Sequence, residues 1–142
     1  MRSERGYTVP EVILFVLVLG ILGMLAMPSF RETGDRLAAN RAARLTATEL
    51  RYAQQAAVAE HTNWGVQVTT TGLTLLRGGA TIRQTAFSDG VTASANFAGA
   101  STVTFSWDGS PSAGGTVTLT TRLDRTLTVT VTGITGRVKV GP

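Results

Sequence analysis

An uninterrupted apolar run is the first pattern along the chain. From Val12 to Met27, sixteen consecutive residues carry neither a charge nor a hydrogen-bonding side chain. With its flanks the run covers residues 7–30, close to the ~20 residues that cross a hydrocarbon core as a helix. The pattern predicts a single membrane-spanning helix over this segment.

Two other interpretations of the apolar run fit less well. A secretory signal peptide has an apolar region of roughly 7–15 residues and a small-residue cleavage site after it. This run is longer, and the sequence AMPSF at its end offers no such site. A buried core helix needs a domain large enough to cover it on every side, and the remaining chain looks too small.

The flanking charges bear on orientation. Arg2 and Arg5 precede the run, and the positive-inside tendency would keep them in the cytoplasm. Residues 31–142 would then lie outside the cytoplasm. Arg31 and Arg36, just beyond the run, weaken this argument, so the charges support the orientation without fixing it.

A second pattern, with a period near 3.6, follows the apolar run. It predicts an amphipathic helix over residues 31–61, with a thin apolar stripe suited to lying on a sheet. The recurring apolar positions are Ala38, Ala42, Leu45, Tyr52, Ala56 and Ala59. The arginines at 36, 41, 44 and 51 mostly fall on the other side, and interleaved acidic residues favour a solvated face over a nucleic-acid stripe.

From Trp64 onward the period changes to two, and Gly-rich turn signals separate short alternating runs. Threonine occupies nineteen of the last eighty-one positions and fills many of the polar slots, as strand propensity favours. Residues 62–142 are therefore predicted to form six to eight antiparallel strands in one or two sheets against the helix, an α+β fold. Both tryptophans, Trp64 and Trp107, are expected in the core.

Composition narrows the chemistry. The chain has 142 residues, no cysteine and a formal charge of +4, which excludes disulfides and by itself predicts no nucleic-acid partner. His61 is the only histidine, and it is expected to cap or follow the helix end. No nucleophile elbow, P-loop, dinucleotide fingerprint or metal-ligand spacing is present. We expect no catalysis, no cofactor and no metal.

Glu11 is the anomaly of the N-terminal segment. A carboxylate near the end of a membrane span costs less than one at its centre, where insertion scales give roughly 2.5–3.5 kcal/mol. It can be a headgroup-level side chain that reaches water, or it can have a cationic partner. Cleavage after Gly6 would create such a cation, the new amino group of Tyr7.

The residues Gly6-Tyr7-Thr8-Val9-Pro10-Glu11, followed by the apolar run, resemble the processing signal of type IV pilins and type II secretion pseudopilins. The resemblance implies that a prepilin peptidase removes the leader, residues 1–6, by cutting between Gly6 and Tyr7. It implies N-methylation of Tyr7 and pairing of Glu11 with the N-terminus of a neighbouring subunit. Tyr7 and Pro10 depart from the commonest residues at these positions, which are Phe and Ile or Leu. Both changes are tolerable, because tyrosine is nearly the same shape as phenylalanine and proline fits a helix's first turn.

The same resemblance implies a helix break or kink at Pro28, aided by Gly20 and Gly23, and a set of partners. These are the peptidase, other pilins or pseudopilins in a fibre, an inner-membrane assembly platform, and membrane lipid before assembly. The precursor would be a single-pass inner-membrane protein with its C-terminal domain outside the cytoplasm, later part of a periplasmic or extracellular fibre.

Within this superfamily the Thr-rich domain resembles GspH/FimT-type minor pilins. Some FimT-type pilins carry a Gly-Arg-x-Arg stretch linked to DNA uptake, and here Gly136, Arg137 and Lys139 match it, with lysine in place of the second arginine. Val138 and Val140 are expected to face inward, with Arg137 and Lys139 facing outward. The alternative is an edge strand whose charges prevent aggregation.

Three functions therefore remain. The first is a structural minor subunit of a type IV pilus or a type II secretion pseudopilus. The alternative is a DNA-binding minor pilin for natural transformation, which would use Arg137 and Lys139. The third is a membrane-anchored β domain that is never cut after Gly6 and joins no fibre.

Overall fold

The computed structural model describes residues 8–88 and 90–141, with the side chains of residues 25–30 outside the description. One helix, α1 (Val9–Glu60), precedes eight described strands, so the predicted α+β class is confirmed. The chain divides into two compact units, Met1–Gly34 and Asp35–Pro142, which we describe separately.

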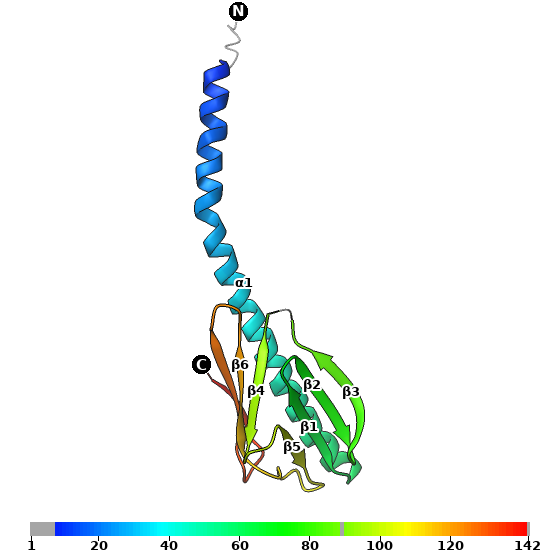
Figure 1. Ribbon diagram of the computed structural model, residues 1–142. Coiled ribbons are helices and arrows are strands. Elements are labelled where there is room, and N and C mark those ends of the chain that lie inside the picture. The colour runs from blue at the N-terminus through cyan, green and yellow to red at the C-terminus, as the bar shows by residue number, and fades with distance from the viewer. Residues whose placement is uncertain (1–7, 89, 142) are drawn as a thin grey trace, which may run out of the picture. The chain divides into compact units, whose positions relative to one another are not determined.

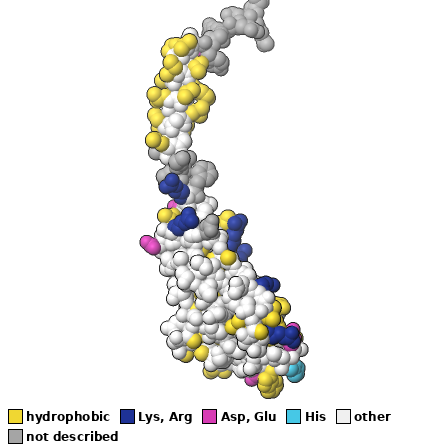
Figure 2. Space-filling model, turned by 45° about the vertical axis from the view of Figure 1, so that its right-hand side comes forward, with side chains coloured by type: hydrophobic (Ala, Val, Ile, Leu, Met, Phe, Trp, Pro, Cys, Tyr) yellow, Lys and Arg dark blue, Asp and Glu magenta, His cyan; other side chains and the backbone are white. Residues whose placement is uncertain are grey.

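The first unit holds the start of α1, where large apolar side chains are exposed from Val9 to Met24. Figure 2 shows hydrophobic side chains gathered over this part of the helix. They include Val12, Phe15 and Leu19, each at least half exposed. The described residues contain no helix that meets the length and hydropathy of a membrane span, so the span predicted over residues 7–30 is not confirmed.

In the second unit, α1 buries a stripe of small residues against the strands, which cross in front of it in Figure 1. The buried positions are Ala39, Ala42, Ala43, Thr46, Ala47, Glu49, Leu50, Ala53 and Ala57. Alanine favours the helix and allows the sheets to approach its backbone closely. The predicted stripe was wrong at Tyr52 and Ala59, which are exposed because the buried face is centred on Leu50 and Ala53.

The end of α1 is set by His61. This residue adopts a left-handed conformation with φ of 51°, and the Thr62 N–H donates to the Ala57 carbonyl at 3.3 Å. That 6→1 hydrogen bond is one half of a Schellman-type helix end. The expectation that His61 follows the helix terminus is confirmed.

The strands form two four-stranded antiparallel sheets. The first has the order β3-β2-β1-β5 and the second β4-β6-β7-β8. The first sheet consists of β1 (Trp64–Thr69), β2 (Gly72–Arg77), β3 (Ala80–Ala86) and β5 (Thr102–Phe105). The second consists of β4 (Thr92–Phe97), β6 (Gly115–Thr120), β7 (Thr126–Val131) and β8 (Val138–Gly141).

The core of this unit follows the predicted alternation. Val66, Val103, Phe105, Val117 and Val129 are fully buried between the sheets and α1. The threonines between them along β6 and β7 are partly or fully exposed, so each strand keeps one apolar and one polar face. Period-two patterning was sufficient to place these strands.

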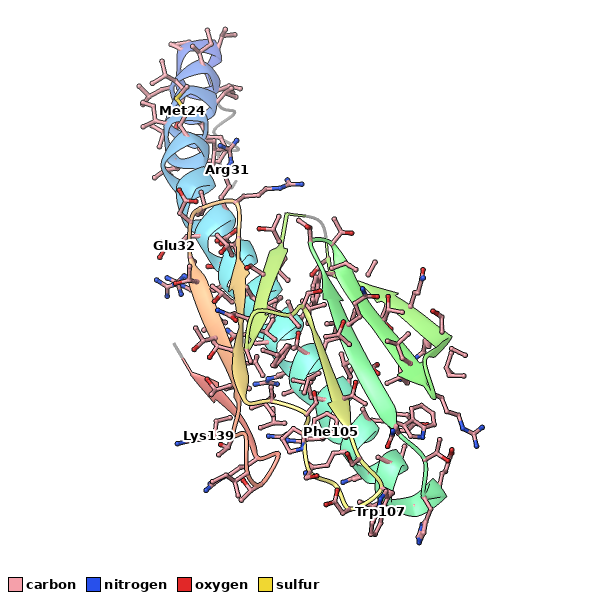
Figure 3. The ribbon with its side chains drawn as sticks, turned by 60° about the horizontal axis from the view of Figure 1, so that its bottom comes forward. Met24, Arg31, Glu32, Phe105, Trp107 and Lys139 are labelled. Carbon is pink, nitrogen blue, oxygen red and sulfur yellow. The ribbon has the colours of Figure 1, made fainter. Side chains whose placement is uncertain are left out.

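The two tryptophans behave differently, and the prediction for one was wrong. Trp64, at the start of β1, is buried as expected. Trp107 is 62% exposed, because β5 ends at Phe105 and the alternation does not continue into the following loop. Figure 3 shows Phe105 among the strands and Trp107 outside them.

The first sheet is joined to α1 by two ion pairs and an aromatic ladder. Arg83 of β3 donates to both oxygens of Glu49 at 2.9 and 2.7 Å, and Arg77 of β2 lies 2.9 Å from Glu60. The guanidinium of Arg83 lies 5.6 Å from the Tyr52 ring centre. Arg77 is similarly placed over Trp64 at 5.9 Å, and the two rings meet edge to face. The charge of each arginine is thus balanced by a glutamate of α1.

Candidate assembly site and basic surface

The first candidate site is the start of α1, where Thr8 and Glu11 cap the helix. The Glu11 and Val12 amides donate to the Thr8 carbonyl at 3.0 and 3.2 Å. The Thr8 amide makes a long hydrogen bond of 3.5 Å to the Glu11 carboxylate. This is half of a capping box, in which a residue of the first turn reaches back to the N-cap amide.

The sequence carried this signal, and it was overlooked. Thr8-Val9-Pro10-Glu11 matches the pattern of Thr followed three residues later by Glu that marks a helix start. Pro10 fits because the first-turn amides have no partner within the helix. A carboxylate in the first turn also complements the helix dipole, so Glu11 has a local structural role besides any partner.

The processing residues cannot be placed, and Pro28 can be placed only in part. Gly6 and Tyr7 lie outside the described residues. Pro28 lies within α1, which is assigned as helix from Val9 to Glu60. A Cβ on Gly20 or Gly23 would meet no atom within 4 Å. The helix break at Pro28 therefore stays a prediction about the assembled subunit.

The second candidate site is β8 and the loop before it. Gln54 of α1 donates through its amide nitrogen to the carbonyls of Gly109 at 2.9 Å and Thr135 at 3.1 Å. One side chain thus holds two loops against the helix. Gly136 follows Thr135 with φ of +63°, and a Cβ there would collide with the Gln54 amide. Glycine is required at this position by both backbone conformation and space.

The C-terminal strand, β8, is an edge strand that contains Lys139, and Arg137 lies immediately before it. It pairs with β7, with Lys139 opposite Thr130 and Val138 opposite Val131. Arg137 and Lys139 are exposed and Val138 is buried, as the alternation predicts. Figure 3 shows Lys139 directed away from the sheet. Val140 pairs with the buried Val129 and so lies on the same face as Val138, as predicted, but it is 47% exposed on this edge strand.

Arg51 belongs to the row of helix arginines that the sequence analysis interpreted as a solvated face, and its contact with the C-terminal strand was not predicted. Its guanidinium donates to the Val138 carbonyl at 3.2 Å, which links α1 to β8. Arg44 precedes it by seven residues and is also exposed. Spacing of seven residues puts both arginines on one line of the helix, but their closeness to β8 is a tertiary contact.

Charge is distributed unevenly over the second unit. Arg77 and Arg83 are paired with glutamates, as described above. Within residues 8–88 and 90–141, no carboxylate pairs with Arg44, Arg51 or Lys139. Uncompensated positive charge therefore remains on the exposed face of α1 and on β8, whereas the arginines of the first sheet are paired.

The loop after β5 offers a third feature, a hollow of about 410 Å³. It is lined by Gln54, Gln55, Val58, Ala59, Asp108 and Gly109. Hydrogen bonds from the Ser110 hydroxyl and amide, at 2.7 and 3.0 Å, lower the pKa of Asp108 from its ordinary value. In the described part of the chain, no three histidine or acidic side chains are grouped to hold a metal. The hollow is thus lined by one carboxylate, whose charged form is favoured by Ser110.

Comparison with known proteins identifies the relatives of this arrangement. The family described as Type II transport protein GspH matches residues 42–135. The type IV minor pilin FimU of Pseudomonas aeruginosa has a TM-score of 0.64 and 21% identity, covering 75% of this chain and 90% of that chain. The minor pseudopilin EpsH from the type 2 secretion system of Vibrio cholerae has a TM-score of 0.60 and 17% identity, with 72% and 94% covered. No curated protein sequence is significantly similar.

The matched region covers most of the fold but does not include the site residues predicted from the sequence. The family match extends from the second half of α1 through β7 into the following loop, so it reaches neither Glu11 nor Arg137 and Lys139. The two structural likenesses show that helix and sheets are arranged as in those proteins.

Proposed function

The chain belongs to the GspH family, within the type IV pilin and pseudopilin superfamily, and we propose from this premise how it is processed, assembled and used. It is a structural subunit of minor pilin or pseudopilin type. The proposal is that it is made as an inner-membrane precursor, cut between Gly6 and Tyr7 by a prepilin peptidase, and N-methylated at Tyr7. It then enters a fibre with other pilins through the apolar start of α1.

The observation that carries this proposal is the arrangement of the first helical unit. Large apolar side chains along α1 are exposed from Val9 to Met24, and Glu11 is the acidic residue of the first turn. Exposed apolar surface on this scale needs lipid or protein to cover it. Membrane lipid covers it before assembly, an inner-membrane platform receives it, and neighbouring subunits cover it in the fibre.

Glu11 has a defined role in this scheme. Once the leader is removed, the amino group of Tyr7 in one subunit is a cation that can pair with the Glu11 carboxylate of its neighbour. In low-dielectric surroundings such a pair is far stronger than in water. Pro28 and the glycines at 20 and 23 provide the place where α1 loosens as it packs into the fibre.

Mass spectrometry of the N-terminal peptide is the first test. Cells that contain the peptidase should yield a peptide that begins with methylated Tyr7, and peptidase-deficient cells should yield one that retains residues 1–6. Glu11→Gln should then block recovery in sheared fibres, whereas Glu32→Gln, the same change elsewhere on α1, should not. An N-terminus that keeps the leader in peptidase-positive cells would contradict processing.

A second candidate function is favoured by one observation, the uncompensated charge beside β8. Arg137 and Lys139 are exposed, and among the described residues neither has a carboxylate partner. We propose that this pair contacts the phosphate backbone of DNA during uptake. Labelled DNA entering a nuclease-protected state should be lost on deletion, restored by the wild type, and not restored by Arg137→Ala/Lys139→Ala. Uptake that survives deletion would remove this function.

A further inference from the structure

We propose that Arg44 and Arg51 of α1 join Arg137 and Lys139 in one phosphate-binding surface for duplex DNA, hereafter the basic surface. The inference rests on the second candidate function, which names only the two residues near the C-terminus. The inference adds the exposed face of α1 to those two residues as a second part of the DNA-binding surface. It also predicts how binding depends on salt concentration.

The contact that unites the two elements is the hydrogen bond from Arg51 to the Val138 carbonyl at 3.2 Å. Val138 lies between Arg137 and Lys139 in the sequence. A guanidinium has five N–H donors, and one of them is engaged at Val138, which leaves others for a phosphate. Arg51 therefore stands at the junction of helix and strand with its charge still accessible.

The direction of β8 extends the surface along the helix. Thr121, in the loop before β7, donates a hydrogen bond to Asp35 of α1, and Thr135, in the loop after β7, accepts one from Gln54. Because the contact before the strand is nearer the start of α1 than the contact after it, β7 runs in the same direction as α1. Its antiparallel partner β8 then returns toward the N-terminal side of this unit.

Arg44 lies on that return path. Seven residues before Arg51, it is about 10.5 Å away along the helix axis and about 20° away around it. The strand from Val138 to Gly141 covers about 10 Å in the same sense. Arg51 and Arg44 thus form a strip along α1 in the direction in which β8 runs past Lys139.

Charge identifies the occupant as a polyanion. Within the part of the chain that the structure describes, the guanidinium of Arg44 and the Lys139 ammonium have no ion pair. Exposed cations that lack a carboxylate partner repel one another, and a bound anion relieves this repulsion. The first sheet offers the contrast, because Arg77 and Arg83 already have glutamates.

Duplex DNA fits better than a single phosphate group because the strip is extended and rich in arginine. Arginine forks bind phosphate oxygens in pairs, and each neutralised phosphate releases a counterion. The surface as defined contains no aromatic or amide side chain, so its contacts are electrostatic and independent of base sequence. Four phosphate contacts correspond to a slope of about −3.6 in log K against log salt concentration.

The test measures anisotropy of a fluorescent 30-base-pair duplex with the full chain in non-ionic detergent, over a series of salt concentrations. Arg44→Ala should lower the magnitude of the slope by about 0.9, and Arg44→Ala/Arg51→Lys should weaken binding further at low salt. Arg77→Ala/Arg122→Ala removes two charges elsewhere and should leave the slope near the wild-type value. A second duplex of unrelated sequence should bind with equal affinity.

Folding does not obscure this test. Arg44 has no hydrogen bond or ion pair within the described residues, so its truncation should leave the thermal midpoint unchanged. If Arg44→Ala binds as the wild type does while Arg137→Ala/Lys139→Ala does not, the inference fails and the second candidate function stands. If the wild type shows no salt-dependent DNA binding, both this inference and the second candidate function are contradicted. Loss of binding to anionic lipid vesicles, with DNA binding intact, would instead assign the surface to membrane and overturn the proposal.

Discussion

Arg51 of α1 donates a hydrogen bond to the carbonyl oxygen of Val138 in β8, joining residues 87 positions apart. The strand it holds is four residues long and lies at the edge of its sheet. A short edge strand has few ladder hydrogen bonds, so a contact of this kind contributes a large share of its local stability. The same contact places the cationic group of Arg51 at Val138, the residue between Arg137 and Lys139.

Removing this contact should loosen β8 more than the rest of the domain. We expect Arg51→Met, which keeps an unbranched apolar side chain, to lower the free energy of unfolding by about 1 kcal/mol, because one hydrogen bond from a charged donor is lost. Amide exchange at Val140 should accelerate more than exchange at Val129. Arg44→Met is the matched control, with an expected change within about 0.5 kcal/mol. Equal effects of the two substitutions in urea unfolding would refute the role given to Arg51.

The two ion pairs of the first sheet should differ in strength because their surroundings differ. The Glu49 side chain is 10% exposed and accepts two hydrogen bonds from Arg83, whereas the Glu60 side chain is 39% exposed with one contact from Arg77. Burial strengthens an interaction between charges and raises the cost of leaving one unpaired. Arg83→Met should therefore destabilise by about 1.5–3 kcal/mol, and Arg77→Met by about 0.2–1 kcal/mol.

A double-mutant cycle for each pair isolates the interaction from lost packing. The coupling between Arg83 and Glu49 should exceed that between Arg77 and Glu60, and salt should weaken the second coupling more. Equal coupling energies would show that the partial burial of Glu49 has no energetic consequence.

Much of this fold could be predicted from the sequence because two periodicities carry it. The spacing of alanines placed the helix, and the alternation through Val66, Val103 and Val117 placed the sheets. The errors in the helix fall at Tyr52 and Ala59, and the error in the strands falls at Trp107, where alternation stops. A strand pattern cannot say where pairing ends, because that depends on the partner strand and on the loops that follow.

The candidate sites were predictable to different degrees. Arg137 and Lys139 were found because they alternate with Val138 on a strand at the chain end. Arg51 was not, because nothing in its local pattern distinguishes it from Arg44; its role depends on a tertiary contact. The capping role of Glu11 was predictable, since Thr8 stands three residues before it and this local pattern needs no distant counter-charge.

Asp108 should remain ionised at unusually acidic pH. Hydrogen bonds from the Ser110 hydroxyl and amide favour its charged form and lower its pKa from the ordinary 3.8. A lowered pKa in the folded state means that the contribution to stability is present above the unfolded value and is lost as pH falls through the folded one. Ser110→Ala removes the largest cause, so the Asp108 pKa should rise toward 3.8 in a carboxyl carbon NMR titration. Asp108 in the unsubstituted protein is the reference, and an unmoved Asp108 curve in Ser110→Ala would exclude this cause.

Gly136→Ala should be more destabilising than Gly99→Ala, although both glycines have positive φ, +63° and +92°. At Gly99 a Cβ would meet nothing within 4 Å, so the substitution adds backbone strain alone. At Gly136 the Cβ would also collide with the Gln54 amide and lie 3.1 Å from the Gly109 carbonyl oxygen. The strain costs of order 1–3 kcal/mol at each site, and the collision adds to it only at Gly136.

The part of the destabilisation at Gly136 that comes from the collision with Gln54 should be removable by a second substitution. Because the clash involves the Gln54 side chain, Gln54→Ala in the Gly136→Ala background should recover part of the lost stability, while Gln54→Ala alone should destabilise by removing two hydrogen bonds. Urea unfolding of the four proteins gives the coupling directly. Additive effects would mean that the loop moves aside without cost. A strong coupling would show that the Gln54 contact fixes the loop from which Arg137 and the basic strand begin.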